Sequence, residues 1–141
     1  MSDKNANQVL TTARTAFKKF QSGWASGDFS DYLALITDDF EFSFPTGEHR
    51  GVFTGNAGRE KMIAKCRDDA ASGARLTLSE PRTVAVDGQT VIFEFESAGD
   101  LDGQPYKGRN IIVLEIHGER VQGYREYFGD LDPKLFGGDA K

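Results

Sequence analysis

The sequence predicts one α+β domain in which three helices cover one face of a strongly bent antiparallel sheet. An apolar helix stripe runs through residues 9–26, whereas strand periodicity dominates from residue 75 onward. The length of 141 residues suits one hydrophobic core better than two. We therefore expect a single domain over residues 1–141, with its core at about residues 9–129 and flexible termini.

Three helices are expected before residue 75. Gly27 can end the first helix, and Asp28 can cap a short second one. A third helix is expected at about residues 57–71, with charged side chains on its solvated face. The apolar positions of the three helices are Val9, Ala13, Ala16, Phe17, Phe20 and Trp24, then Phe29, Tyr32, Leu33 and Ile36, then Met62, Ile63, Cys66 and Ala70.

Strands are expected in most of the remaining chain. Phe40, Phe42 and Phe44 alternate with polar residues, which is typical of a strand with one aromatic face, and a glycine-rich loop over residues 47–55 is expected next. Later strands are expected to begin at Arg75, Thr83, Thr90, Asn110 and Arg120. Tight turns at Asp87-Gly88, Asp102-Gly103 and His117-Gly118 favour an antiparallel meander, and the tail after Asp130 is expected to fray or to cover a neighbouring molecule.

Composition narrows the partners. The net charge is −5 and basic runs are absent, so a nucleic acid is not expected as a partner. No apolar run is long enough to span a membrane and the first residues are polar, which predicts a cytoplasmic protein without a membrane contact. Cys66 is the only cysteine, and His49 and His117 are far apart in the chain, so neither a metal nor a cofactor is expected.

Two segments place carboxylates on strand faces. In residues 90–97, Glu94 and Glu96 share a face opposite to the phenylalanines, and in residues 120–128, Glu126 lies between Tyr124 and Phe128 on one face. A carboxylate among aromatic rings loses hydration, which raises its pKa toward the range that a general acid or base needs. Glu126, Glu94, Glu96 and Arg109 are therefore the candidate catalytic residues.

A plainer interpretation stays open for these charged residues. Glu94 and Glu96 can equally belong to a solvated outer surface, paired with Lys107 or Arg125 across strands. The aromatic neighbours of Glu126 favour a functional role for it more strongly, because an exposed strand face seldom alternates Tyr, Glu and Phe. The aromatic residues expected to line a ligand pocket are Trp24, Tyr32, Phe44, Tyr124 and Phe128.

The segments from Gly103 to Asn110 and from Gly123 to Phe128 resemble the SnoaL-like polyketide cyclase branch of the nuclear transport factor 2-like superfamily, which has a cystatin-like α+β fold. The resemblance covers roughly residues 9–129. It implies a curved antiparallel sheet wrapped around the long N-terminal helix and two shorter helices, forming a cone with one internal pocket. It also implies a homodimer that pairs through the outer face of the sheet, for which Val113, Val121 and Tyr127 are candidates.

The resemblance also bears on activity. Glu126 matches an acidic position of cyclase-like, limonene epoxide hydrolase-like and phenazine-biosynthesis members. On the strand that here carries Glu94 and Glu96, the hydrolases have an arginine and an aspartate two positions apart. Glu96 matches the aspartate, but Glu94 replaces the arginine. This departure argues against epoxide hydrolysis unless Arg109 substitutes for the arginine from the next strand. Ketosteroid isomerase has its general base at the position of Phe44, and its oxyanion-binding tyrosine and aspartic acid at the positions of Phe20 and about Ile112. All three polar groups are absent here, so steroid isomerisation is excluded.

Two hypotheses follow from the sequence. The first is an enzyme that performs acid/base chemistry of the cyclase, isomerase, dehydratase or hydrolase type on a small, apolar, oxygenated metabolite, with Glu126 transferring the proton. The second is a non-catalytic module of the same fold that binds a small molecule or serves in dimeric assembly. A small-molecule ligand is the expected partner in the first hypothesis and one of the possible partners in the second.

Overall fold

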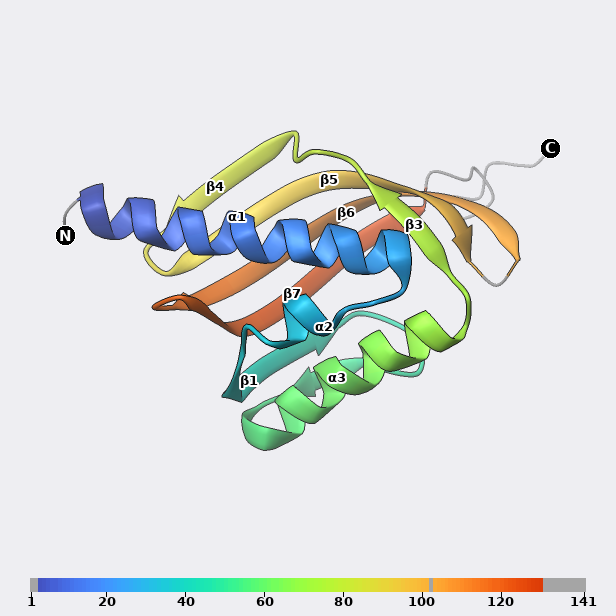
Figure 1. The fold of residues 1–141 in the computed structure, drawn as a ribbon, viewed down its shortest axis with the longest axis horizontal. Coiled ribbons are helices and arrows are strands. Elements are labelled where there is room, and N and C mark those ends of the chain that lie inside the picture. Colours follow the sequence, from blue (N-terminus) through green and yellow to red (C-terminus); the bar gives the residue numbers. More distant parts are fainter. Residues whose placement is uncertain (1–2, 102, 131–141) are drawn as a thin grey trace.

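The computed structural model describes residues 3–101 and 103–130 and has the expected α+β order (Figure 1). Its elements are α1 (Asp3–Ser26), α2 (Ser30–Leu33), β1 (Ile36–Phe44), β2 (Gly51–Phe53), α3 (Gly55–Ala71), β3 (Arg75–Leu78), β4 (Thr83–Asp87), β5 (Thr90–Leu101), β6 (Gln104–His117) and β7 (Arg120–Asp130). The tail after Asp130 and Asp102 of the expected Asp102-Gly103 turn lie outside the described residues. None of the helices in the described ranges is long and apolar enough to cross a membrane, and the cytoplasmic location stays a prediction.

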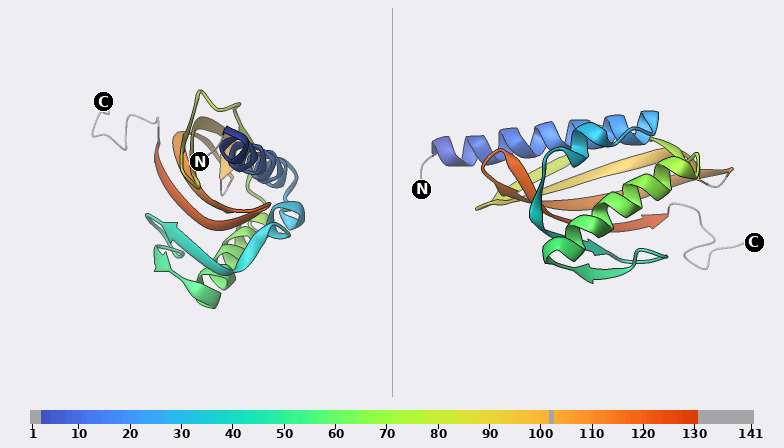
Figure 2. Two further views of the ribbon diagram at one scale, coloured as in Figure 1. Left: turned by 90° about the vertical axis from the view of Figure 1, so that its left-hand side faces the viewer. Right: turned by 60° about the horizontal axis from the view of Figure 1, so that its bottom comes forward.

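The strands form one curved sheet in the order β2-β1-β7-β6-β5-β3, with β4 paired to β5. The sheet bends so that α1 and α3 lie on its concave side (Figure 2). Most neighbours are antiparallel, as predicted, and Gly88 and Gly118 take the positive φ that their tight turns require. The pairing of β1 with β7 is parallel, which the turn residues could not indicate because no turn joins these two strands.

The first two helices meet with almost no loop. Gly27 ends α1 at a φ of +88°, and its N–H donates a hydrogen bond to the carbonyl of Gly23, which confirms its predicted role. Asp28 accepts a hydrogen bond of 2.9 Å from the N–H of Ser30 at the start of α2. The helix α2 is only one turn long, however, so the assignment of Ile36 to it was wrong: Ile36 begins β1.

Two further local predictions differ from the structure. Residues 51–53 were expected to be loop but form β2, a short edge strand in which Phe53 pairs with Phe42. Three residues are too few to show a periodicity, so only the contact with β1 reveals this strand. Val121 was expected on the outer face, but a register shift opposite Glu115 and Ile116 turns its side chain into the core, where it is fully buried.

The core fills the space between the helices and the concave face of the sheet. Phe17 of α1 stacks on Phe93 at 4.8 Å between ring centroids, and Phe20 lies 5.6 Å from Tyr124. Burial of each such side chain contributes about 1.5–3 kcal/mol. The helix α3 packs directly on β1 because Gly58 has no side chain; a Cβ there would collide with the carbonyl oxygen of Phe40. These contacts fix the walls of the cavity described below.

Candidate functional site

A cavity of about 490 Å³ lies between the C-terminal part of α1, one side of α3 and the concave face of β5, β6 and β7. Its walls combine aromatic and aliphatic side chains with a small set of charged ones, as is usual for small-molecule sites. The residues that line it are Trp24, Phe44, Thr46, Gly47, Glu48, His49, Lys65, Asp68, Asp69, Ser72, Ala74, Leu76, Ser97, Leu101, Tyr106, Asn110, Glu126 and Phe128. A second hollow of about 420 Å³, beside Thr11 and Glu119, has no aromatic lining residue.

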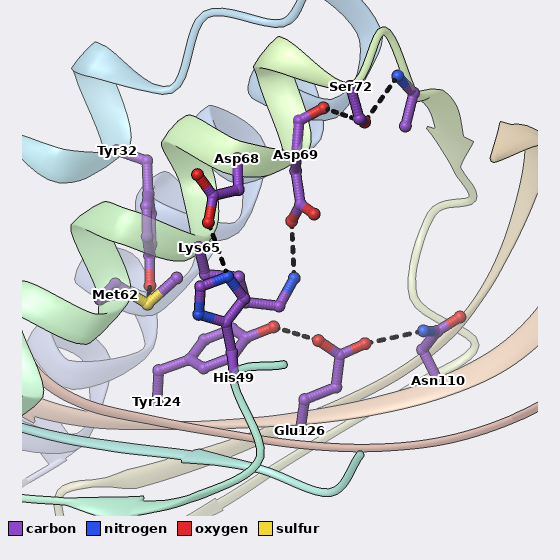
Figure 3. Close-up of polar contacts among 11 residues, drawn as sticks. Tyr32, His49, Met62, Lys65, Asp68, Asp69, Ser72, Asn110, Tyr124 and Glu126 are labelled. Atoms are coloured by element: carbon purple, nitrogen blue, oxygen red, sulfur yellow. Dashed lines mark hydrogen bonds and ion pairs between the residues drawn. The ribbon is translucent and has the colours of Figure 1, made fainter. Parts of the chain in front are cut away.

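Glu126 points into this cavity from β7. It pairs across the sheet with Ile112, whose side chain is buried on the concave face, so the register places Glu126 on that face as well. One carboxylate oxygen accepts a hydrogen bond from the hydroxyl of Tyr124, and the other accepts one of 2.9 Å from Nδ2 of Asn110 (Figure 3). Asn110 is oriented in turn by Ser97, whose hydroxyl donates to Oδ1 at 2.7 Å.

The pKa of Glu126 is raised above its ordinary value, chiefly because the surrounding protein removes water from the carboxylate. The nearby ammonium of Lys65 and the hydrogen bonds from Tyr124 and Asn110 act in the opposite direction, since they favour the charged form. The side chain still keeps intermediate exposure because the cavity opens beside it. Such a group can both lose and accept a proton while a ligand lies against it.

Lys65 is a site residue that the sequence did not reveal. It lies on the face of α3 that was predicted to be solvated, yet it is only 7% exposed. Its ammonium donates a hydrogen bond of 2.6 Å to Asp69 (Figure 3). The ammonium also lies 4.4 Å from the ring centroid of Phe44 and 5.4 Å from that of Trp24. The (i, i+4) spacing to Asp69 was the only signal in the sequence, and that spacing is equally common on exposed helix faces.

The five predicted pocket residues divide into two groups. Trp24, Phe44 and Phe128 line the cavity itself. Tyr32 and Tyr124 are buried behind the lining, where Tyr124 holds Glu126 and the hydroxyl of Tyr32 donates to Sδ of Met62 at 3.7 Å. Burial raises the pKa of both phenols, so both remain neutral donors.

The other predicted catalytic residues lie elsewhere. Glu94 and Glu96 alternate with the buried Phe93 and Phe95, so they occupy the convex face of β5, where Glu96 pairs across the sheet with the exposed Arg109. Of the two interpretations left open by the sequence, the geometry matches the solvated outer surface. The structure therefore does not bring these three residues to Glu126; the parity of the strand was visible in the sequence, but the direction in which the sheet bends was not.

His49 lies at the edge of the cavity. Its side chain is 13% exposed, and Nε2 lies 3.0 Å from Oδ2 of Asp68 on α3, which ties the segment after β1 to that helix. Glu48, His49 and Asp68 could each offer one ligand atom to a metal ion, and these atoms lie within 4.8 Å of one another. The sequence did not predict this group because Asp68 comes from a different element.

Comparison with known proteins identifies the domain type. Residues 17–124 match the family model of the SnoaL-like domain. A nuclear transport factor 2 (NTF2)-like protein from Anabaena variabilis is 32% identical, with a TM-score of 0.81, and the alignment covers 92% of this chain and 94% of that one. No match was found among curated proteins.

Two further solved structures share the fold. A protein from Bacillus subtilis that is described as an isomerase candidate is 25% identical, with a TM-score of 0.71 and coverage of 93% of this chain and 96% of that chain. An LEH-like epoxide hydrolase from M. tuberculosis is 19% identical, with a TM-score of 0.65 and coverage of 89% and 90%. At that identity, the likeness to the hydrolase concerns the fold alone.

Proposed function

The chain belongs to the SnoaL-like domain family, and from that premise we propose that it performs acid/base chemistry on a small, apolar, oxygenated metabolite bound in the cavity, with Glu126 as the proton-transfer residue. One observation carries the proposal. The carboxyl group of Glu126 faces the cavity between two fixed donors, Tyr124 and Asn110, in surroundings that raise its pKa. Cyclisation, isomerisation, dehydration and hydrolysis all use a proton transfer of this kind.

The tyrosine and the asparagine orient the reacting group in this proposal. Each donates to a different oxygen of Glu126, so the carboxyl group has a fixed plane and one accessible side toward the cavity. When Glu126 is ionised it can remove a proton from the ligand, and the two donors then stabilise its charge. When it is protonated it can return that proton to another ligand atom. Phe128 and Phe44 contribute apolar surface to the same cavity.

A solvent-exchange assay tests this proposal for the reactions that begin with removal of a proton from carbon, as in cyclisation and isomerisation, because it detects that step whatever the final product is. The protein is incubated in D₂O with a panel of small ketones and hydroxyketones, and the entry of deuterium at carbon is followed by proton NMR. We expect the wild type to accelerate exchange for the ligands that it accepts. Glu126→Gln should lower this rate by about 10²–10⁴-fold, which is the usual contribution of a positioned acid or base.

Glu94→Gln is the matched control, since it makes the same chemical change on the convex face and should keep the rate within about twofold. Exchange that survives Glu126→Gln unchanged would refute the proposal. Saturable binding of these compounds without any exchange by the wild type would instead favour the second hypothesis, a non-catalytic binding module.

We also propose that the protein forms a homodimer through the convex face of β6 and β7. Tyr127 and Ile111 are paired across these strands and are 53% and 39% exposed, which is unusual for adjacent large apolar side chains. Val113, the other remaining candidate from the sequence, lies on this face but is only 5% exposed, so it adds little to the apolar surface. Val121, which the sequence had suggested for this interface, is excluded from it by its burial.

A further inference from the structure

The cavity contains a buried cation opposite Glu126. Lys65 extends from α3, and its ammonium lies over the rings of Trp24 and Phe44. Lys65 as a whole residue is only 7% exposed, and removal of water from an ammonium is costly unless other groups replace that water. The aromatic faces replace part of it, because their π electrons attract a cation. Lys65 is therefore held in place on the cavity wall with its charged end at the lining.

Asp69 also replaces part of the water that the ammonium of Lys65 has lost. Its Oδ2 accepts a hydrogen bond of 2.6 Å from Nζ of Lys65, and this is the one hydrogen bond of the ammonium among residues 3–101 and 103–130. An ammonium has three N–H groups, so two remain for water or for a ligand. Lys65 and Glu126 line the same cavity, and no ion pair joins them, so a ligand in the cavity can contact both residues.

The charges around the cavity determine which ligand atom suits this position. The ammonium of Lys65 is already compensated by Asp69, and no other lysine or arginine lines the cavity within the described part of the chain. The remaining acidic groups of the lining are Glu48, Asp68 and Glu126. An anionic ligand would thus meet a surplus of carboxylates, whereas an uncharged oxygen can accept a hydrogen bond from Lys65 without that repulsion.

We infer that Lys65 is a specificity-determining residue of the cavity, which donates a hydrogen bond to an uncharged carbonyl, ether or hydroxyl oxygen of the ligand. Asp69 holds the ammonium in place and disfavours anions at the same position. This inference rests on the proposed function in one respect, namely that the cavity binds a ligand. It does not depend on Glu126 being catalytic, and it adds a ligand class: an apolar body that carries a neutral oxygen acceptor.

Three benzene derivatives of similar size serve as probes: acetophenone with a neutral oxygen acceptor, toluene with none, and benzoate with a negative charge. Trp24 is the only tryptophan of the sequence and lines the cavity, so its indole N–H signal in a ¹H–¹⁵N NMR spectrum reports binding. We expect Lys65→Met to lower the affinity for acetophenone by about tenfold, which is the usual effect of losing a charge-assisted hydrogen bond. The affinity for toluene should change by less than about twofold, because the contacts of toluene are apolar.

Variants on the same helix serve as comparisons. Lys61→Met also removes a lysine that lies over a ring, that of Phe53, but it does not line the cavity and should leave all three affinities unchanged. Lys65→Arg retains a cationic donor and should keep the preference for acetophenone over toluene. Asp69→Asn should raise the affinity for benzoate, relative to that for acetophenone, by about tenfold. This comparison can be made even if Lys65→Met fails to fold.

The outcomes separate this inference from the function of Glu126. The role of Lys65 would be overturned if Lys65→Met lowered the affinities for acetophenone and toluene equally, or if Asp69→Asn did not raise the affinity for benzoate. Neither result would affect the proton-transfer role of Glu126. If Glu126→Gln loses deuterium exchange but still prefers acetophenone over toluene and benzoate, the result would support proton transfer by Glu126 and a binding preference that is independent of Glu126. Failure of all three probes to shift the Trp24 signal would overturn the cavity as a binding site and this inference with it.

Discussion

Glu126 has lost much of its water but keeps two hydrogen-bond donors and a nearby ammonium. Desolvation raises its pKa, while Lys65, Tyr124 and Asn110 lower it, and desolvation is the larger effect. A structural carboxylate would be expected to have the opposite balance, with its charge fully compensated in the folded state. The raised pKa of a cavity-facing group is typical of functional sites.

The stability of the protein should report this pKa. In the unfolded chain Glu126 has its ordinary pKa, so the folded state binds the proton more tightly than the unfolded state does. The stabilisation by that proton is fully present below the ordinary pKa and is lost as the pH rises through the raised one. Glu126→Gln mimics the neutral carboxyl at every pH. The free energy of unfolding of Glu126→Gln, relative to the wild type, should therefore increase as the pH rises above 4.5, the ordinary pKa of a glutamate.

Urea unfolding at a series of pH values measures this difference. A difference that stayed constant across the series would contradict the raised pKa, even if the variant proved more or less stable at every pH.

At the scale of elements, the site depends on how closely α3 approaches the sheet. Lys65 and Asp69 reach the cavity only because Gly58, about two turns earlier on α3, lets the helix pack against the backbone of β1 and β2. Its absent side chain would meet the carbonyl oxygens of Phe40 and Phe53. These are backbone atoms within paired strands, so they cannot move aside as the end of a flexible side chain could.

Gly58→Ala should therefore displace α3 and destabilise the fold by about 1–3 kcal/mol, in spite of the better helix propensity of alanine. Thermal unfolding measures the loss, and the Trp24 signal should also move because Lys65 lies over that ring. Asn56→Ala is the control, since Asn56 is an exposed neighbour in the same turn of α3. Equal stability of Gly58→Ala and the wild type would show that the close approach of α3 is not required.

At the scale of the whole molecule, the curvature of the sheet gives its two faces different roles. The concave face holds the helices, the core and Glu126, whereas the convex face carries Glu94, Glu96, Arg109 and the exposed pair Ile111 and Tyr127. Charged residues surround this apolar pair, as is usual at the rim of an interface between subunits.

Tyr127→Glu should convert the proposed dimer into a monomer, because it places a charge in the centre of the apolar surface. Light scattering should then give 15.5 kDa for the variant and twice that mass for the wild type. Val52→Glu is the matched control, since Val52 on β2 is 66% exposed but lies at the far edge of the sheet. A wild type that scatters as a 15.5 kDa species at micromolar concentration would contradict the dimer.

Most element types, the tight turns at Gly88 and Gly118, and the side-chain parity of most strand positions could be predicted from the sequence, with β2 and Val121 as the exceptions. Local chemistry is sufficient for these features: the stripe of α1, the positive φ at Gly27, and the placement of Glu126 between Tyr124 and Phe128 all depend on residues near one another in the chain. Glu126 could be singled out for the same reason.

Which face of each strand became the inside could not be predicted from the sequence. That choice follows from the direction in which the sheet bends around α1 and α3, and it separated Glu126 from Glu94 and Glu96 although both strands show the same alternation. The tertiary structure also decided the parallel pairing of β1 with β7, and the burial of Lys65 between Trp24 and Phe44. The physical reason is that these features arise from contacts between distant segments, whose free energy no local pattern encodes.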